Sequence, residues 1–163
     1  VMDIITATTN DIETIQKIAL PTWKVTYSEI LSTEQMEYML DMMYSNESLT
    51  EQLSNKNQTF LFACENNEAL GFVSFEIENG DKVKLHKLYV LPDQQGKKIG
   101  ETLINEVAKR TSEAKKTTIQ LNVNRFNKAL NFYKRIGFEI VEEVDVEIGN
   151  GYLMEDYVLE KQV

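Results

Sequence analysis

The chain has 163 residues, the size of one domain with its own hydrophobic core, and we expect a single domain over 1–163. Its net charge of −9 argues against nucleic-acid binding, which needs a basic surface, and favours cationic small molecules, although solubility alone also explains the acidity. No apolar run reaches about 18 residues, so we expect no membrane association. Cys64 is the only cysteine and no secretion signal is evident, so we expect a cytoplasmic protein.

The N-terminal part of the chain predicts a short strand followed by helices. Residues 4–6 have the apolar pattern of a strand. Asn10 is expected to cap a helix, with Glu13 as its reciprocal partner. Pro21 should end or kink this helix, because proline lacks the N–H that a helix interior needs. STEQ at 32–35 is a second capping box, and further helices should follow it.

The apolar pattern changes to that of strands at residue 59. TFLFACE (59–65), LGFVSFEIE (70–78) and VKLHKLYVL (83–91) each predict one strand. Asn79-Gly80 is a strong hairpin signal between the second and the third. These three strands should therefore form an antiparallel meander.

The rest of the chain adds helices and strands in alternation. A helix should follow Gly100, a strand is expected at 117–123, a short helix should end at Gly137, and a hairpin should turn at 150–151. The strand–helix–strand step over 83–123 requires a right-handed crossover, so its two strands should be parallel. The sequence thus predicts an α/β protein with a mixed, mostly antiparallel sheet of about seven strands, a strand–helix–strand core and flanking helices.

A basic, glycine-containing loop joins the third meander strand to the next helix. It reads LYVLPDQQGKKIG over 88–100. Glycine allows close backbone approach to a ligand, and the N-terminus of the helix favours an anion. Lys97 and Lys98 add positive charge. The loop lacks the sequence of a nucleotide P-loop. It predicts a phosphate-binding site, with a tight turn carrying solvated lysines as the alternative.

LYVLPDQQGKKIGETLI resembles the acetyl-CoA signature of the GNAT N-acetyltransferases, which reads Gln or Arg, two residues, Gly, one residue, then Gly or Ala. Gln95 and Gly100 match the two ends, whereas Lys98 stands where the middle glycine usually lies. ALNFYKRIGF at 129–138 is similar to the second signature of the family, although Asn127 lies two residues before the alanine rather than three. The element order also fits the GNAT fold across almost the whole chain.

The resemblance implies acetyl-CoA as co-substrate and no metal ion. The backbone of the strand before the loop would pair with the pantetheine arm, and an N–H near Leu88 would face the thioester oxygen. Asn127 would bind the pantetheine amide. Lys134 and Arg135 are candidates for the adenosine phosphates, with solvated helix charges as the alternative. The cofactor-binding residues implied are Leu88, Tyr89, Val90, Gln95, Gly96, Lys97, Lys98, Ile99, Gly100, Asn127, Phe132 and Tyr133.

Two residues are predicted to be catalytic. By resemblance, Tyr133 is the general acid that protonates the CoA thiolate; a core tyrosine is the alternative. His86 is the only histidine, and its reference pKa of about 6.5 suits a general base. Strand alternation would place it on the face of Leu88 and Val90. Glu76 or Glu78 on the adjoining strand are alternatives to His86 as the base, and His86 itself has a purely structural alternative.

The acceptor pocket should lie against the first helices, as in the family. Trp23 and Tyr27, with His86, are the predicted substrate-binding residues, and helix core is the alternative for both aromatics. Further aromatic and sulfur side chains on this wall are Tyr38, Met42 and Tyr44. Acidic residues in the last hairpin would form an anionic rim or a solvated face: Glu143, Asp145, Glu147, Glu155 and Asp156.

The layout from PTWKVTYSEILSTEQ to YLMEDYVLEK is most similar to the bacterial spermidine/spermine acetyltransferase branch of the family. The function implied is acetyl transfer to a primary amine of a small molecule, with polyamines as the favoured class, by direct attack in a ternary complex. A protein N-terminal or lysine acetyltransferase is one alternative, and a non-catalytic CoA-binding sensor is another. Exposed edge strands make a homodimer an expectation.

Overall fold

The computed structural model describes residues 2–55 and 57–163. Its centre is a seven-stranded sheet in the order β1-β2-β3-β4-β5-β7-β6. The strands are β1 (Asp3–Thr6), β2 (Thr59–Glu65), β3 (Glu68–Ile77), β4 (Lys82–Val90), β5 (Thr118–Asn124), β6 (Glu139–Gly149) and β7 (Tyr152–Gln162). The helices are α1 (Ile12–Tyr27), α2 (Thr33–Tyr44), α3 (Asn46–Ser54), α4 (Ile99–Glu113) and α5 (Ala129–Arg135). Short 3-10 turns lie at Thr9–Asp11 and Pro92–Gln94.

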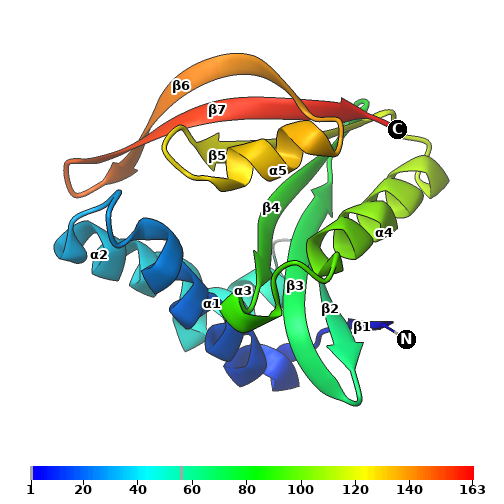
Figure 1. Cartoon of the computed structure of the whole chain (residues 1–163), viewed down its shortest axis with the longest axis horizontal. Helices are drawn as coiled ribbons and strands as arrows, with labels where there is room; N and C mark the ends of the chain where they lie inside the picture. The colour runs from blue at the N-terminus through cyan, green and yellow to red at the C-terminus, as the bar shows by residue number, and fades with distance from the viewer. Residues whose placement is uncertain (1, 56) are drawn as a thin grey trace.

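Helices cover the sheet on both sides (Figure 1). One core joins α4 and α5 to the sheet, with Leu103 and Val107 packed against strand residues such as Ile119. The other core joins α1, α2 and α3 to the opposite face, where Trp23 and Phe60 are fully buried. No described helix is long and apolar enough to cross a membrane.

The sheet divides between β4 and β5, which are the one parallel pair among the described strands. Their pairing extends only over Lys82–Lys84 and Thr118–Gln120. Beyond it β4 continues to Val90 along β3, and β5 continues to Asn124 along β7. The two halves of the sheet therefore diverge (Figure 1), and the β4 edge that faces β5 is left without a strand partner among the described residues after Lys84. The predicted fold, including the parallel crossover, is confirmed.

The predicted cap of the first helix is wrong, and of the prediction that Pro21 ends or kinks this helix, the ending is wrong. Thr8, not Asn10, is the capping residue: its Oγ1 accepts from Asn10 N–H, and its own N–H donates to Asp11 Oδ2 at 2.7 Å. This reciprocal pair begins a 3-10 turn that leads into α1. Pro21 does not end the helix, because residues before and after it, such as Ile18 and Trp23, are buried in the same core.

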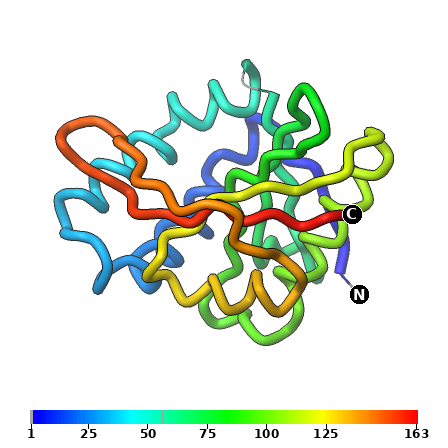
Figure 2. Tube along the Cα trace, turned by 90° about the horizontal axis from the view of Figure 1, so that it is seen from above, coloured from blue at the N-terminus to red at the C-terminus, as the bar shows by residue number. Residues whose placement is uncertain are grey.

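The predicted capping box at the start of α2 is half formed. Ser32 Oγ accepts from Gln35 N–H at 3.1 Å. The Gln35 amide instead donates to Leu153 O at 2.9 Å, and Tyr38 OH donates to Ile148 O at the same distance. These bonds attach α2 to the β6–β7 hairpin, whose tip lies beside α2 in both views of the chain (Figures 1 and 2).

Candidate active site

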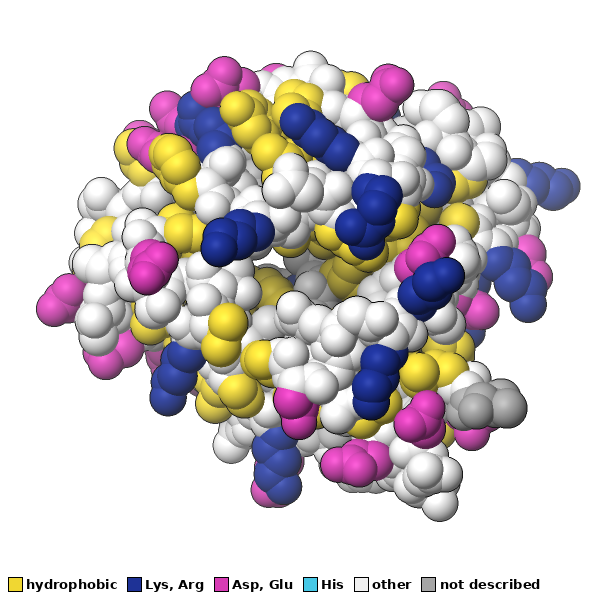
Figure 3. Space-filling model, in the orientation of Figure 1, with side chains coloured by type: hydrophobic (Ala, Val, Ile, Leu, Met, Phe, Trp, Pro, Cys, Tyr) yellow, Lys and Arg dark blue, Asp and Glu magenta, His cyan; other side chains and the backbone are white. Residues whose placement is uncertain are grey.

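A cavity of about 860 Å³ lies where β4 and β5 diverge. Its walls come from the end of α1, the open edge of β4, the loop before α4, the start of α4, β5 and α5. Figure 3 shows a hollow in this face of the molecule, with hydrophobic side chains at its floor and Lys or Arg side chains around it. The predicted site residues that line the cavity are Tyr27, His86, Leu88, Tyr89, Val90, Gln95, Gly96, Lys98, Ile99, Gly100, Asn127, Phe132 and Tyr133.

Trp23 and Lys97 are the two predicted site residues that do not line this cavity. Trp23 is only 1% exposed, and its ring lies 4.3 Å from that of Tyr27, so it supports the Tyr27 side chain from the core. Lys97 Nζ donates to Gln94 Oε1 at 2.8 Å, within the loop itself.

The loop before α4 has the backbone of an anion site. Gly96 (φ 90°) and Lys98 (φ 62°) both have left-handed conformations. Lys98 therefore takes up the left-handed conformation that glycine adopts most easily, so the departure from the family signature does not prevent this conformation. The first helical hydrogen bond runs from Thr102 N to Lys98 O at 3.0 Å. The N–H groups that precede it at the start of α4 have no intrahelical partner and can bind a diphosphate.

Helix α4 starts in close contact with α5. A Cβ on Gly100 would lie 3.2 Å from Phe132 Cζ, so a glycine allows the two elements to approach. Four lysine or arginine residues line the cavity, and three of them, Lys98, Lys128 and Arg135, belong to the loop before α4 or to α5 and its start. The Arg135 guanidinium lies 5.5 Å from the centre of the Phe132 ring. Lys134, the other candidate for the adenosine phosphates, does not line it. The backbone and charge of this end of the cavity fit the diphosphate of CoA.

The open edge of β4 offers main-chain groups to an extended ligand. Leu88, Tyr89 and Val90 line the cavity on this edge. Gln95 Nε2 donates to Val90 O at 3.2 Å, which joins the end of β4 to the loop. An exposed strand edge binds an extended chain of alternating donors and acceptors as an added strand, and the pantetheine arm has two such amides.

Tyr133 is buried in α5 between two aromatic rings. Its ring centre lies 5.3 Å from that of Phe132 and 5.5 Å from that of Phe138. Burial, and to a lesser degree Tyr89, raises the pKa of the Tyr133 hydroxyl well above its usual value. The hydroxyl is therefore a neutral donor at physiological pH.

Asn127 holds the start of α5. Its Oδ1 accepts from Ala129 N–H at 2.9 Å, and its Nδ2 donates to Tyr27 OH at 3.4 Å. In the structure it therefore links α5 to the end of α1, across the cavity that both residues line.

His86 occupies a β-bulge in β4. Ser74 pairs with Lys87 and Phe75 with Leu85, which leaves His86 without a partner on β3. Because of this extra residue, His86 lies on the face of Glu76, whereas Leu88 packs against the core on the opposite face. The expectation that His86 shares a face with Leu88 and Val90 is therefore wrong.

The His86 imidazole contacts a carboxylate. Its Nε2 lies 3.0 Å from Glu76 Oε1. Burial lowers the pKa of His86, and the hydrogen bond with Glu76 opposes this effect. Glu76 does not line the cavity, so it acts on the cavity only through His86. Neither does Glu78 line it; its N–H bonds to Lys82 O in the hairpin.

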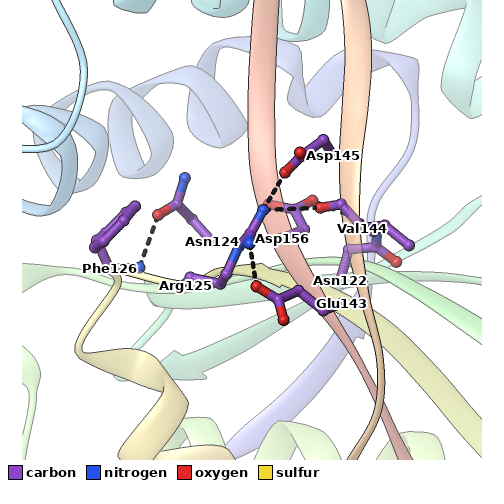
Figure 4. A network of polar contacts seen from close by, with 8 residues as sticks. All are labelled: Asn122, Asn124, Arg125, Phe126, Glu143, Val144, Asp145 and Asp156. Atoms are coloured by element: carbon purple, nitrogen blue, oxygen red, sulfur yellow. Dashed lines mark hydrogen bonds and ion pairs between the residues drawn. The ribbon is translucent and has the colours of Figure 1, made fainter.

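The acidic rim is partly neutralised. Arg125 forms ion pairs with Glu143 and Asp145 of β6, and it also donates to Val144 O at 3.4 Å (Figure 4). Glu147 remains exposed. Met42 is exposed and Tyr44 is buried, and neither lines a cavity described here.

A second cavity, of about 320 Å³, lies between the α1–α2 connection and the β6–β7 hairpin. It shares Ile30 and Phe126 with the larger cavity, and Asn124 and Glu155 are among its other lining residues. Sequence reasoning missed Phe126, whose side chain is 63% exposed. An apolar residue directly before the polar Asn127 in a loop was the one signal available.

Comparison with known proteins agrees with this geometry. A sequence model described as an acetyltransferase (GNAT) domain matches residues 27–160. A spermidine N(1)-acetyltransferase of Thermoplasma acidophilum is 34% identical over 150 residues, which cover 89% of this chain and 90% of that protein.

Solved structures show the same fold. The PaiA N-acetyltransferase from Thermoplasma acidophilum, in complex with coenzyme A, superposes with a TM-score of 0.83 at 30% identity, over 100% of this chain and 99% of that one. The Escherichia coli ribosomal-protein-S18-alanine N-acetyltransferase superposes with a TM-score of 0.75 over 100% and 94%, but at 15% identity it shares the fold alone. Since the family model covers most of the chain and includes the acetyl-CoA loop, the chain belongs to the GNAT acetyltransferase family and is an acetyl-CoA-dependent N-acetyltransferase.

Proposed function

We propose that this single domain transfers the acetyl group of acetyl-CoA to a primary amine of a polyamine, by direct attack in a ternary complex. The observation that carries the proposal is the cavity between β4 and β5, which His86 and Tyr133 both line beside the anion-binding loop. The 34% identity to a protein named as a spermidine N(1)-acetyltransferase supports the acceptor class.

The acceptor must first lose a proton. A primary amine has a pKa of about 10.4, so it is mostly an ammonium ion at neutral pH. In the proposed mechanism His86 accepts this proton, directly or through a water molecule, and Glu76 stabilises the imidazolium that results. Because burial lowers its pKa, His86 is neutral and able to accept a proton at physiological pH.

The free amine then attacks the thioester carbonyl carbon. A carbon–nitrogen bond forms and the carbon–sulfur bond breaks. A main-chain N–H near Leu88 stabilises the negative charge that develops on the carbonyl oxygen. The attacking nitrogen gives up its second proton to solvent as the amide forms. Tyr133 donates a hydrogen bond, and finally a proton, to the departing thiolate, and solvent returns a proton to the Tyr133 oxygen. A cysteine-linked intermediate has no support, because Cys64 is buried in β2 and does not line the cavity.

A steady-state assay of CoA release tests the proposal against its rivals. The acceptors are spermidine, spermine, small monoamines, aminoglycosides and short peptides, and the background of Cys64 with the thiol reagent is subtracted. Saturable turnover with polyamines is expected. Turnover with peptides alone would assign the protein to protein acetylation. Tight CoA binding without turnover on any acceptor would favour a non-catalytic CoA-binding module.

A further inference from the structure

Asp156 is a buried carboxylate that the proposed mechanism does not use. It lies on β7 opposite Asn124 of β5 and Val144 of β6, and it is 8% exposed. Its Oδ2 accepts a long hydrogen bond from Asn122 Nδ2 at 3.4 Å. Its Oδ1 is buried and has no hydrogen-bond partner in the described part of the chain. A buried carboxylate oxygen without a donor is costly, so a ligand that donates a hydrogen bond to Oδ1 would be favoured.

Asp156 itself lines neither cavity, but its neighbours line both. Asn122, its hydrogen-bond partner, lines the larger cavity. Glu155, its chain neighbour, and Asn124, its β5 partner, line the smaller one. Tyr27, on the wall of the larger cavity, is close enough to Asp156 to interact electrostatically with it. Burial is the main cause of the raised pKa of Tyr27, and the charge of Asp156 is a lesser cause.

The cations near Asp156 are bound elsewhere. Lys84 Nζ donates to Asn122 Oδ1 at 2.8 Å, and Arg125 forms ion pairs with Glu143 and Asp145 (Figure 4). Burial raises the pKa of Asp156, whereas Asn122, Lys84 and Arg125 lower it, so the protein compensates this carboxylate only in part. An ammonium group of a ligand would supply both the missing donor and the missing charge.

We propose that Asp156, with Glu155 beside it, binds the ammonium group of the acceptor that is remote from the reacting nitrogen. The acceptor then extends from the reaction centre at Tyr133, past Tyr27, to the junction of the two cavities. This selects a diamine or polyamine over a monoamine of equal length. The inference rests on the proposed function in taking the Tyr133 end of the cavity as the place of acetyl transfer.

The test compares the wild type with Asp156→Asn, using acetyl-CoA with 1,4-diaminobutane or spermidine and, as the monoamine, butylamine. Asp156→Asn removes the charge that binds the remote ammonium group. It should raise the KM for the two polycations by roughly tenfold to a hundredfold, with little change in kcat or in the KM for butylamine. Glu142→Gln is the matched control, because it removes the same charge from an exposed position on the same hairpin. It should leave all constants unchanged.

Two further measurements keep the inference falsifiable. The first is Glu155→Gln, which serves if Asp156→Asn fails to fold, because Glu155 lies on a cavity wall rather than in the core. This variant should raise the KM for polycations by a smaller factor than Asp156→Asn. Calorimetric binding of spermidine to the CoA-loaded protein should be weakened by the same variants even without turnover. Equal effects on polycations and butylamine, or no effect of either variant, would overturn the inference. Failure of the proposed function is distinct, since the wild type would then turn over no polyamine.

Discussion

The imidazole of His86 on β4 contacts the carboxylate of Glu76 on the neighbouring strand β3, with Nε2 and Oε1 3.0 Å apart. The contact depends on the bulge in β4, which places His86 on the face of Glu76 of β3, and His86 also lines the cavity. A histidine held in this way has a fixed ring orientation and a partner for its protonated form. These are two properties that a general base needs.

The pH dependence of turnover should report His86. Since burial lowers its pKa below 6.5, the neutral base is lost only at more acidic pH, and kcat/KM should fall as the pH drops through that lowered value. His86→Gln should lower kcat by about 100-fold and abolish this acid limb. Glu76→Gln should move the limb to still lower pH, because the imidazolium loses its partner. An unchanged limb in His86→Gln would remove His86 from the mechanism.

The hydroxyl of Tyr133 can be tested with a single-atom deletion. Tyr133→Phe keeps the ring packed between Phe132 and Phe138, so the fold and CoA binding should be retained. Loss of the donor to the thiolate should lower kcat by about 100-fold or more. Stopped-flow acetyl transfer and calorimetric CoA binding measure the two quantities separately. Equal kcat in variant and wild type would show that another donor serves the leaving group.

Much of the fold follows from local patterns in the sequence. In each strand of the meander, apolar residues either alternate with polar ones or form a continuous run of the length of a strand. Asn79-Gly80 marks the hairpin between the second and the third strand. The loop before α4 combines glycine, lysine and a helix start, which is enough to predict an anion site. Such features depend on neighbouring residues only, so a single sequence reveals them.

The parts that sequence reasoning missed depend on contacts between distant segments. The bulge at His86 is defined by the register of β3 against β4, and alternation within β4 alone gives the wrong face. The burial of Trp23 behind Tyr27, rather than on the cavity wall, is decided by the packing of α1. In the sequence Asp156 is one more carboxylate of an acidic strand, and only the neighbouring strands reveal that it is buried.

The left-handed conformation of Lys98 predicts a stabilising substitution. A non-glycine residue at φ 62° carries a strain of about 1 kcal/mol, which glycine avoids. Lys98→Gly should therefore raise Tm by roughly 2–4 °C, as measured by calorimetry without ligand. It should also raise the KM for acetyl-CoA, because one cation of the cavity is lost. Lys98→Val is the opposite control and should lower Tm. A Tm for Lys98→Gly below that of the wild type would contradict the strain.

The raised pKa of Asp156 predicts how Asp156→Asn changes stability with pH. Burial makes the folded protein bind this proton more tightly than the unfolded chain, whose value is near 3.8. The wild type therefore loses stability from this group as the pH rises through the raised pKa, whereas the amide of the Asp156→Asn variant does not titrate and has no such dependence. The Tm of the variant minus that of the wild type should therefore increase between pH 4 and pH 7.5. Any effect of the amide that does not depend on pH shifts this difference equally at every pH and leaves the trend unchanged. A matching series with Glu142→Gln controls for net charge.

Added spermidine at pH 7.5 should raise the Tm of the wild type more than that of the Asp156→Asn variant, because the ligand supplies the partner that Oδ1 lacks. In the pH series, a Tm difference between Asp156→Asn and the wild type that does not vary with pH would show that burial does not destabilise the charged form of Asp156.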